Sequence, residues 1–159
     1  PPTAFNQQIS FGSLFYVAGI IGLGALVASS GLGTMLADGF LTVLALEPGH
    51  AAVNFASLVL TGVLIGPFTT LPGQPAVLTP LADHLATASG LPLEAVLNLE
   101  VLSFSTILVP YQSAPMIVGI QLGGQRLGDA TRLVAVLAAL TLVIVLPLDF
   151  LWWRLLGWI

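Results

Sequence analysis

Two polar segments punctuated by proline interrupt otherwise strongly apolar sequence, and they constrain the fold more than any other feature. The first is Pro67-Phe-Thr-Thr-Leu-Pro-Gly-Gln-Pro75 and the second is Pro110-Tyr-Gln-Ser-Ala-Pro115. Because each proline lacks a backbone N–H and clashes with the preceding helical turn, neither segment can carry an uninterrupted helix. Irregular backbone at bilayer depth is tolerated only where it is buried in protein or lines a watery cavity. In a membrane protein, both breaks are therefore expected to face the interior.

The composition predicts a membrane protein. Hydrophobic residues make up 57% of the chain, charged residues 6%, and the mean hydropathy is +1.04, whereas soluble domains carry roughly 25% charged residues. The chain has no lysine and a net charge of -4, which argues against a nucleic-acid partner. The absence of cysteine excludes disulfides and thiolate metal sites. We expect an all-α protein of the plasma (inner) membrane, with the lipid bilayer as its surroundings.

The pattern predicts a single transmembrane unit over residues 1–159, built as a helical bundle. Its expected parts are spans over residues 11–30, 32–46 and 128–151, a hairpin over 51–89 and a discontinuous helix over 93–122. The hairpin has an uncharged tip and a second arm of about 14 residues, or roughly 21 Å, too short to cross a bilayer. These features favour a re-entrant hairpin, although two complete crossings would return the chain to the same side.

The few arginines predict the orientation. Arg126 and Arg132 bracket one short loop, and positively charged loops tend to lie in the cytoplasm. The C-terminus would then lie outside.

The breaks also carry the polar groups of the predicted binding site. Interrupted helices release backbone carbonyls and amides, and a half-helix starting near Ala76 would direct its positive end toward an anion. Hydroxyl and amide side chains add donors and acceptors, although a simple proline kink whose threonines bond back to their own helix would look similar. The expected substrate- and ion-binding residues are Thr69, Thr70, Gln74, Pro110, Gln112, Ser113, Ala114 and Pro115.

Glu100 is an ionisable residue inside an apolar segment. Such residues mark functional sites in membranes, so Glu100 is a candidate proton carrier. Alternatively, it lies near the outer interface or pairs with an arginine from another part of the protein. Asp83 and His84 lack a third ligand at a suitable spacing for a metal, and we expect neither a metal site nor a catalytic residue.

Three motifs carry a family resemblance: Ala76-Val-Leu-Thr-Pro80, Pro110-Tyr-Gln-Ser-Ala-Pro115-Met-Ile-Val-Gly119 and Leu151-Trp-Trp-Arg-Leu-Leu-Gly157. With their order along the chain, they resemble the C-terminal half of the divalent anion:sodium symporter family, within the ion transporter superfamily. The resemblance implies that the chain is the second of two inverted repeats, that an N-terminal repeat is its partner, and that the protein forms a homodimer. At the hairpin tip, Thr70, Leu71 and Pro72 stand where the family has Ser-Asn-Thr.

The resemblance implies a secondary active transporter of small anions, such as dicarboxylates or sulfate, working by ion-coupled alternating access. It would be a symport permease without a bound cofactor, coupled to sodium ions or protons, and not an enzyme. Because the Ser-Asn-Thr pattern is lost, a cation:proton antiporter or a metalloid-export permease of the same superfamily is the alternative. Two further alternatives are not transporters. One is an intramembrane enzyme that uses Asp83, His84 and Glu100, and the other is a non-transporting scaffold subunit.

Overall fold

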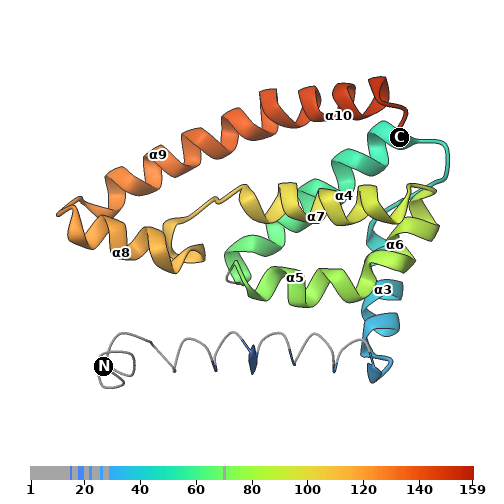
Figure 1. Ribbon diagram of the computed structural model, residues 1–159, viewed down its shortest axis with the longest axis horizontal. Helices are drawn as coiled ribbons and strands as arrows, with labels where there is room; N and C mark the ends of the chain where they lie inside the picture. Colours follow the sequence, from blue (N-terminus) through green and yellow to red (C-terminus); the bar gives the residue numbers. More distant parts are fainter. Residues whose placement is uncertain (1–14, 16–17, 20–21, 23–25, 27–28, 70) are drawn as a thin grey trace, which may run out of the picture.

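The computed structural model describes residues 15, 18–19, 22, 26, 29–69 and 71–159, and all regular secondary structure in these residues is helical (Figure 1). Most of the span expected over residues 11–30 lies outside the described residues. Helix α3, Leu32–Val43, follows Gly31, whose φ of 77° suits glycine. The helix ends at Val43, since the backbone of Leu44 is extended, and the turn at Glu47 follows.

The predicted hairpin region folds into two helical arms. The first arm is α4, Ala51–Ile65, which continues into the 3₁₀ turn η1, Gly66–Phe68. The chain then reverses, and the second arm follows as α5, Gly73–Leu78, the 3₁₀ turn η2, Thr79–Leu81, and α6, Ala82–Ser89. Pro67 and Pro80 are the second residues of η1 and η2, where the chain changes from α-helix to 3₁₀-helix.

The second break separates two helices. Helix α7, Leu93–Ser105, is followed by a linker that contains the 3₁₀ turn η3, Pro110–Gln112, and then by α8, Ala114–Leu122. The linker is extended at Val109 and Ser113. Figure 1 shows α8 continuing in the general direction of α7 beyond this linker.

The last helical element is long and strongly apolar. It comprises α9, Leu127–Leu140, a π-helical stretch η4, Thr141–Val145, and α10, Leu146–Leu155. Within the described part of the chain, two helices are long and apolar enough to cross a membrane, Ala51–Phe68 and Leu127–Leu155. Both Arg126 and Arg132, at the start of this element, are exposed.

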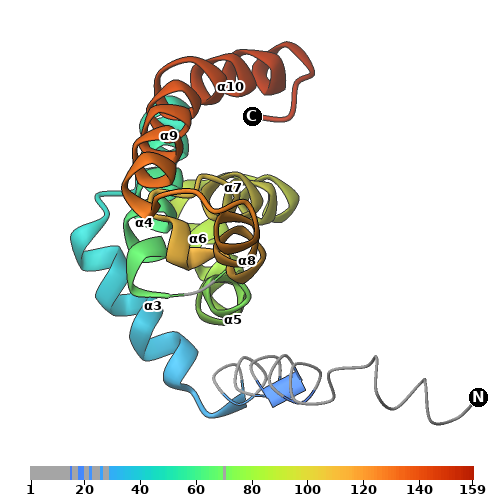
Figure 2. The ribbon, with the colours of Figure 1, turned by 90° about the vertical axis from the view of Figure 1, so that its left-hand side faces the viewer.

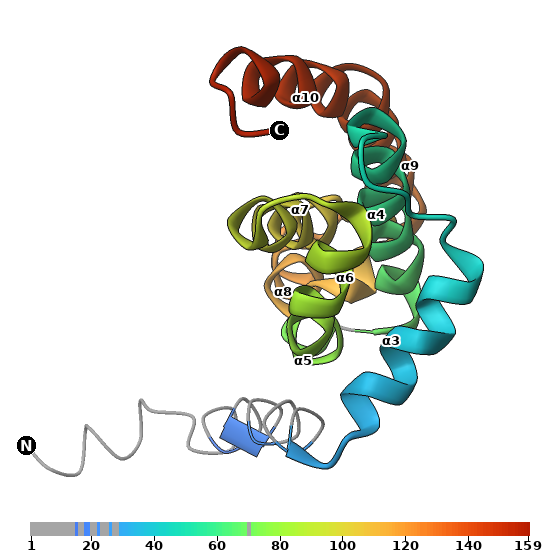
Figure 3. The ribbon, with the colours of Figure 1, turned by 90° about the vertical axis from the view of Figure 1, so that its right-hand side faces the viewer.

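The core lies where α4 packs across α7, with α5 and α6 beside them. Figures 2 and 3 show α5, α6, α7 and α8 gathered next to α4, while α9 and α10 run along one side. The most buried apolar side chains include Val59, Leu81, Val96 and Leu99. This packing fixes the relative positions of the two breaks.

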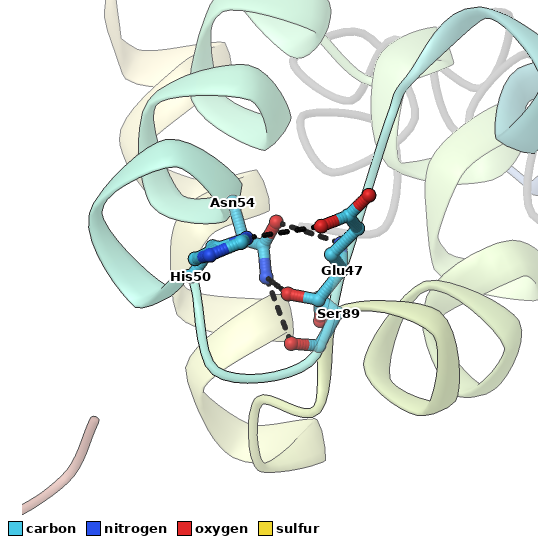
Figure 4. A network of polar contacts seen from close by, with 4 residues as sticks. All are labelled: Glu47, His50, Asn54 and Ser89. Carbon is cyan, nitrogen blue, oxygen red and sulfur yellow. Dashed lines mark hydrogen bonds and ion pairs between the residues drawn. The ribbon is translucent and has the colours of Figure 1, made fainter.

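A buried asparagine closes one end of the bundle (Figure 4). The amide nitrogen of Asn54 donates to the carbonyl oxygens of Glu47 at 2.7 Å and Ser89 at 2.8 Å. The Asn54 side chain is fully buried. It therefore ties the turn before α4 to the end of α6.

Candidate functional site

The two proline-punctuated breaks meet in the structure. The backbone N–H of Leu71, in the hairpin turn, donates to the carbonyl oxygen of Gln112 at 3.0 Å. The hydroxyl of Tyr111 donates to the carbonyl oxygen of Pro67. These bonds join the hairpin turn directly to the α7–α8 linker, and we call this region the junction.

Gln112 organises the linker side of the junction. Its Oε1 accepts hydrogen bonds from the backbone N–H groups of Leu108 and Val109, both at 2.8 Å. Because both partners are donors, they fix which end of the amide carries the oxygen. The Nε2 amino group of Gln112 therefore points the other way, and it makes no hydrogen bond to another described residue.

Gln74 organises the hairpin side. Its Nε2 donates to the carbonyl oxygen of Gly62 at 2.8 Å and to Ser103 Oγ at 3.2 Å. Ser103 Oγ in turn donates to the carbonyl oxygen of Glu100 at 2.7 Å. The side chain of Gln74 is almost completely buried, so this amide links α4, α5 and α7. Its Oε1 is left without a hydrogen-bond partner among the described residues.

Two glycines one helical turn apart make room for these side chains. A Cβ on Gly62 would lie 2.2 Å from Ser103 Oγ, and a Cβ on Gly66 would lie 2.4 Å from Gln112 Nε2 and 3.6 Å from Gln74 Oε1. The Gly-x-x-x-Gly spacing lets α4 approach its neighbours closely. The unpaired amino group of Gln112 and the unpaired oxygen of Gln74 therefore both lie beside Gly66.

The remaining predicted residues divide into buried and exposed groups. Pro110 and Ser113 are buried in the linker, whereas Ala114 and Pro115, in the first turn of α8, are exposed. Thr69 is bonded back to its own helix, because its hydroxyl donates to the carbonyl oxygens of Ile65 and Gly66, both at 3.4 Å. Thr70 lies outside the described residues.

Glu100 is buried in α7 against the turn η2, with 9% of its surface exposed. Its Oε2 accepts a hydrogen bond from Thr79 Oγ1 at 2.9 Å, while its Oε1 is buried without a partner in the part of the chain that the structure describes. No ion pair joins it to a basic side chain of the described residues.

Sequence reasoning missed three residues of this region. Gly62, Gly66 and Ser103 shape the contacts of Gln74 and Gln112. The four-residue spacing of the glycines was a readable signal, as was the position of Ser103 one helical turn after Glu100. Neither signal reveals which side chains would fill the space.

Comparison of the chain with protein-family models, with curated proteins and with solved structures finds no match. Its function is therefore inferred from the residues and contacts described above.

Proposed function

We propose that this chain is one repeat of a secondary active transporter for small anions, such as a dicarboxylate or sulfate, which works by ion-coupled alternating access. In this proposal α4 to α6 form a re-entrant hairpin, and α7 and α8 form a discontinuous transmembrane helix. The observation that carries the proposal is the junction, where the Leu71 N–H binds the Gln112 carbonyl. Meeting points of irregular backbone from two interrupted elements are typical of transporter binding sites.

The junction offers neutral hydrogen-bond donors to an anion. The amino group of Gln112 points away from its backbone partners, and the hydroxyl of Ser113 makes no side-chain cap at the start of α8. Both groups can donate to a carboxylate or sulfate oxygen. All three arginines of the chain, Arg126, Arg132 and Arg154, are exposed. Recognition by neutral donors keeps binding reversible, as a transport cycle requires.

The proposed site is completed by other parts of the assembly. An N-terminal repeat would face the junction and supply the second half of the site, and the protein would act as a homodimer in the plasma membrane. Sodium ions or protons would serve as coupling ions. The unpaired oxygen of Gln74 is an acceptor that suits a cation or a protonated group on the ligand.

A cation:proton antiporter is the second candidate. It is favoured by one observation, the buried carboxyl of Glu100 without a basic partner among the described residues. Buried acidic groups in membranes serve as proton relays. In that case the junction would bind a cation through oxygen atoms, and no anion would be transported.

Uptake into proteoliposomes tests the proposal. The full-length protein is reconstituted and supplied with labelled sulfate, succinate or citrate under an inward sodium gradient, an inward proton gradient, or neither. Accumulation of at least one of these anions under a gradient is expected. If neither gradient drives any of them, while an outward proton gradient drives cation uptake, the antiporter is the correct assignment.

A further inference from the structure

Glu100 lines a small and mostly apolar cavity. The side chains of Glu100, Thr61 and Ser103 line a cavity of about 20 Å³. The other lining residues are Phe40, Leu44, Leu58, Leu78, Leu85, Val96 and Leu99. A volume of about 10–15 Å³ is enough for one water molecule. The cavity therefore has room for a single water molecule.

The polar groups of this cavity do not form a metal site. Thr61 Oγ1 already donates to the carbonyl oxygen of Ser57 at 2.7 Å, and Ser103 Oγ donates to that of Glu100 at 2.7 Å. Hard cations such as calcium or magnesium take about six or more oxygen ligands, and three oxygen-bearing side chains among apolar neighbours fall short of that number. A proton needs only the carboxyl oxygen itself, and a neutral carboxylic acid removes the cost of burying a charge.

No second charge near Glu100 offsets a carboxylate within the described residues. From α6, which packs against α7, and α3, which packs against α6 and η2, the titratable side chains are Asp83, His84 and Asp38, and all three are exposed. Glu94, on α7 itself, is also exposed. None of these groups lines the cavity. Helices α4 and α5 and the turn η2 carry no titratable residue.

Glu100 is connected to the returning arm of the hairpin at two points. Through Thr79 it is bonded to η2, in the returning arm of the hairpin. The backbone carbonyl of Glu100 accepts from Ser103 Oγ, which in turn accepts from the amide of Gln74 in α5. A change at this carboxyl can therefore alter the contact between the hairpin and α7 without a direct contact to the ligand.

We propose that Glu100 is the coupling group of the transporter and that its ligand is a proton, not a sodium ion. This inference rests on the proposed transport function. When the proton is bound to Oε1, the carboxyl is neutral, and Thr79 donates its hydrogen bond to Oε2. When the proton leaves to solvent, the carboxylate must move toward water, which separates η2 from α7. One proton is taken up on one side of the membrane and released on the other in each cycle.

Infrared spectroscopy of the full-length protein, purified in detergent without substrate, tests the bound proton. A carbonyl band of a buried carboxylic acid is expected at neutral pH, disappearing as the pH is raised. Glu100→Gln should remove this band, whereas Glu94→Gln, an exposed glutamate on the same helix, should keep it. Thr79→Val keeps Glu100 but removes the donor to its carboxylate, so it should move the loss of the band to higher pH. A wild-type spectrum without the band, or a band retained in Glu100→Gln, would overturn the inference.

Uptake of labelled succinate, sulfate and citrate tests the coupling. Under an inward proton gradient, Glu100→Gln is expected to lower accumulation at least tenfold, while Glu94→Gln accumulates as much as the wild type. Equal accumulation by Glu100→Gln and the wild type would overturn the coupling role and leave the transport function standing. Absence of accumulation in the wild type itself, with the infrared band present, would contradict the proposed function, and the coupling role with it.

Discussion

The backbone N–H of Leu71 donates to the carbonyl oxygen of Gln112 across 3.0 Å. This single bond joins two segments that the sequence separates by an entire helical arm and α7. Both segments release backbone groups because prolines interrupt their helices. Pairing between them satisfies part of that backbone and leaves side-chain donors and acceptors for a ligand.

The amino group of Gln112 is predicted to recognise the anion. Gln112→Glu keeps an oxygen for the Leu108 and Val109 N–H groups but replaces the free amino group by a charged oxygen. We expect uptake of labelled anions into proteoliposomes to fall at least tenfold, because like charges repel.

The matched control is Gln121→Glu, which introduces the same charge on an exposed residue of α8. Uptake by this variant should stay close to that of the wild type. Equal losses in the two variants would show that added charge, and not the position of Gln112, is responsible.

The close approach at Gly62 is predicted to be essential for packing. In Gly62→Ala the new Cβ would lie 2.2 Å from Ser103 Oγ, so either α4 or α7 must shift. Overpacking of this kind costs about 1–3 kcal/mol, which thermal unfolding in detergent would detect. Gly119→Ala, where a Cβ meets no other atom within 4 Å, should be at least as stable as the wild type. A Gly62→Ala variant of unchanged stability would mean that the two helices are not packed as described.

Asn54 is predicted to stabilise one end of the bundle through its hydrogen bonds to two backbone carbonyl groups. Asn54→Ala leaves the carbonyl oxygens of Glu47 and Ser89 without this donor, at a cost of about 1–3 kcal/mol for the buried groups. Asn98→Ala is the control, because that amide donates only to the carbonyl of Glu94 on its own helix. The thermal midpoint should fall clearly for Asn54→Ala and little for Asn98→Ala; the reverse order would contradict the account.

The hydroxyl of Tyr111 is predicted to stabilise the junction. Tyr111→Phe removes its hydrogen bond to the Pro67 carbonyl and keeps the ring. A net loss of about 0.5–1.5 kcal/mol is expected. Hydrogen–deuterium exchange provides a local measurement, since the Leu71 amide should exchange faster in the variant. Unchanged exchange at Leu71 would show that the tyrosine bond does not support the junction.

The sequence predicted the breaks well because their cause is local. Prolines disrupt the helical hydrogen-bond ladder, and the α-helical structure is interrupted between Ile65 and Gly73 and between Ser105 and Ala114. The second arm begins at Gly73, earlier than the half-helix expected near Ala76. Pro75 is accommodated because the first turn of a helix has no partner for its N–H groups.

The contacts between the breaks could not be predicted in the same way. Whether Gln112 meets Leu71 depends on how α4 packs across α7, which no single segment encodes. Thr69 shows the same limit, because its hydroxyl bonds to its own helix as readily as to a ligand. The unpaired oxygen of Glu100 likewise became visible only once its neighbours were in place.

The most direct test of the central claim asks whether an anion binds at the junction. The 159-residue sequence contains no cysteine, so a thiol can be introduced at a chosen position. Ala114→Cys places it on an exposed residue next to Ser113, and Ser105→Cys places it on an exposed residue of α7. Saturating succinate, sulfate or citrate is predicted to slow modification by a thiol reagent severalfold at position 114 and not at 105. If none of these anions protects position 114, or if they protect both positions equally, the junction is not the binding site.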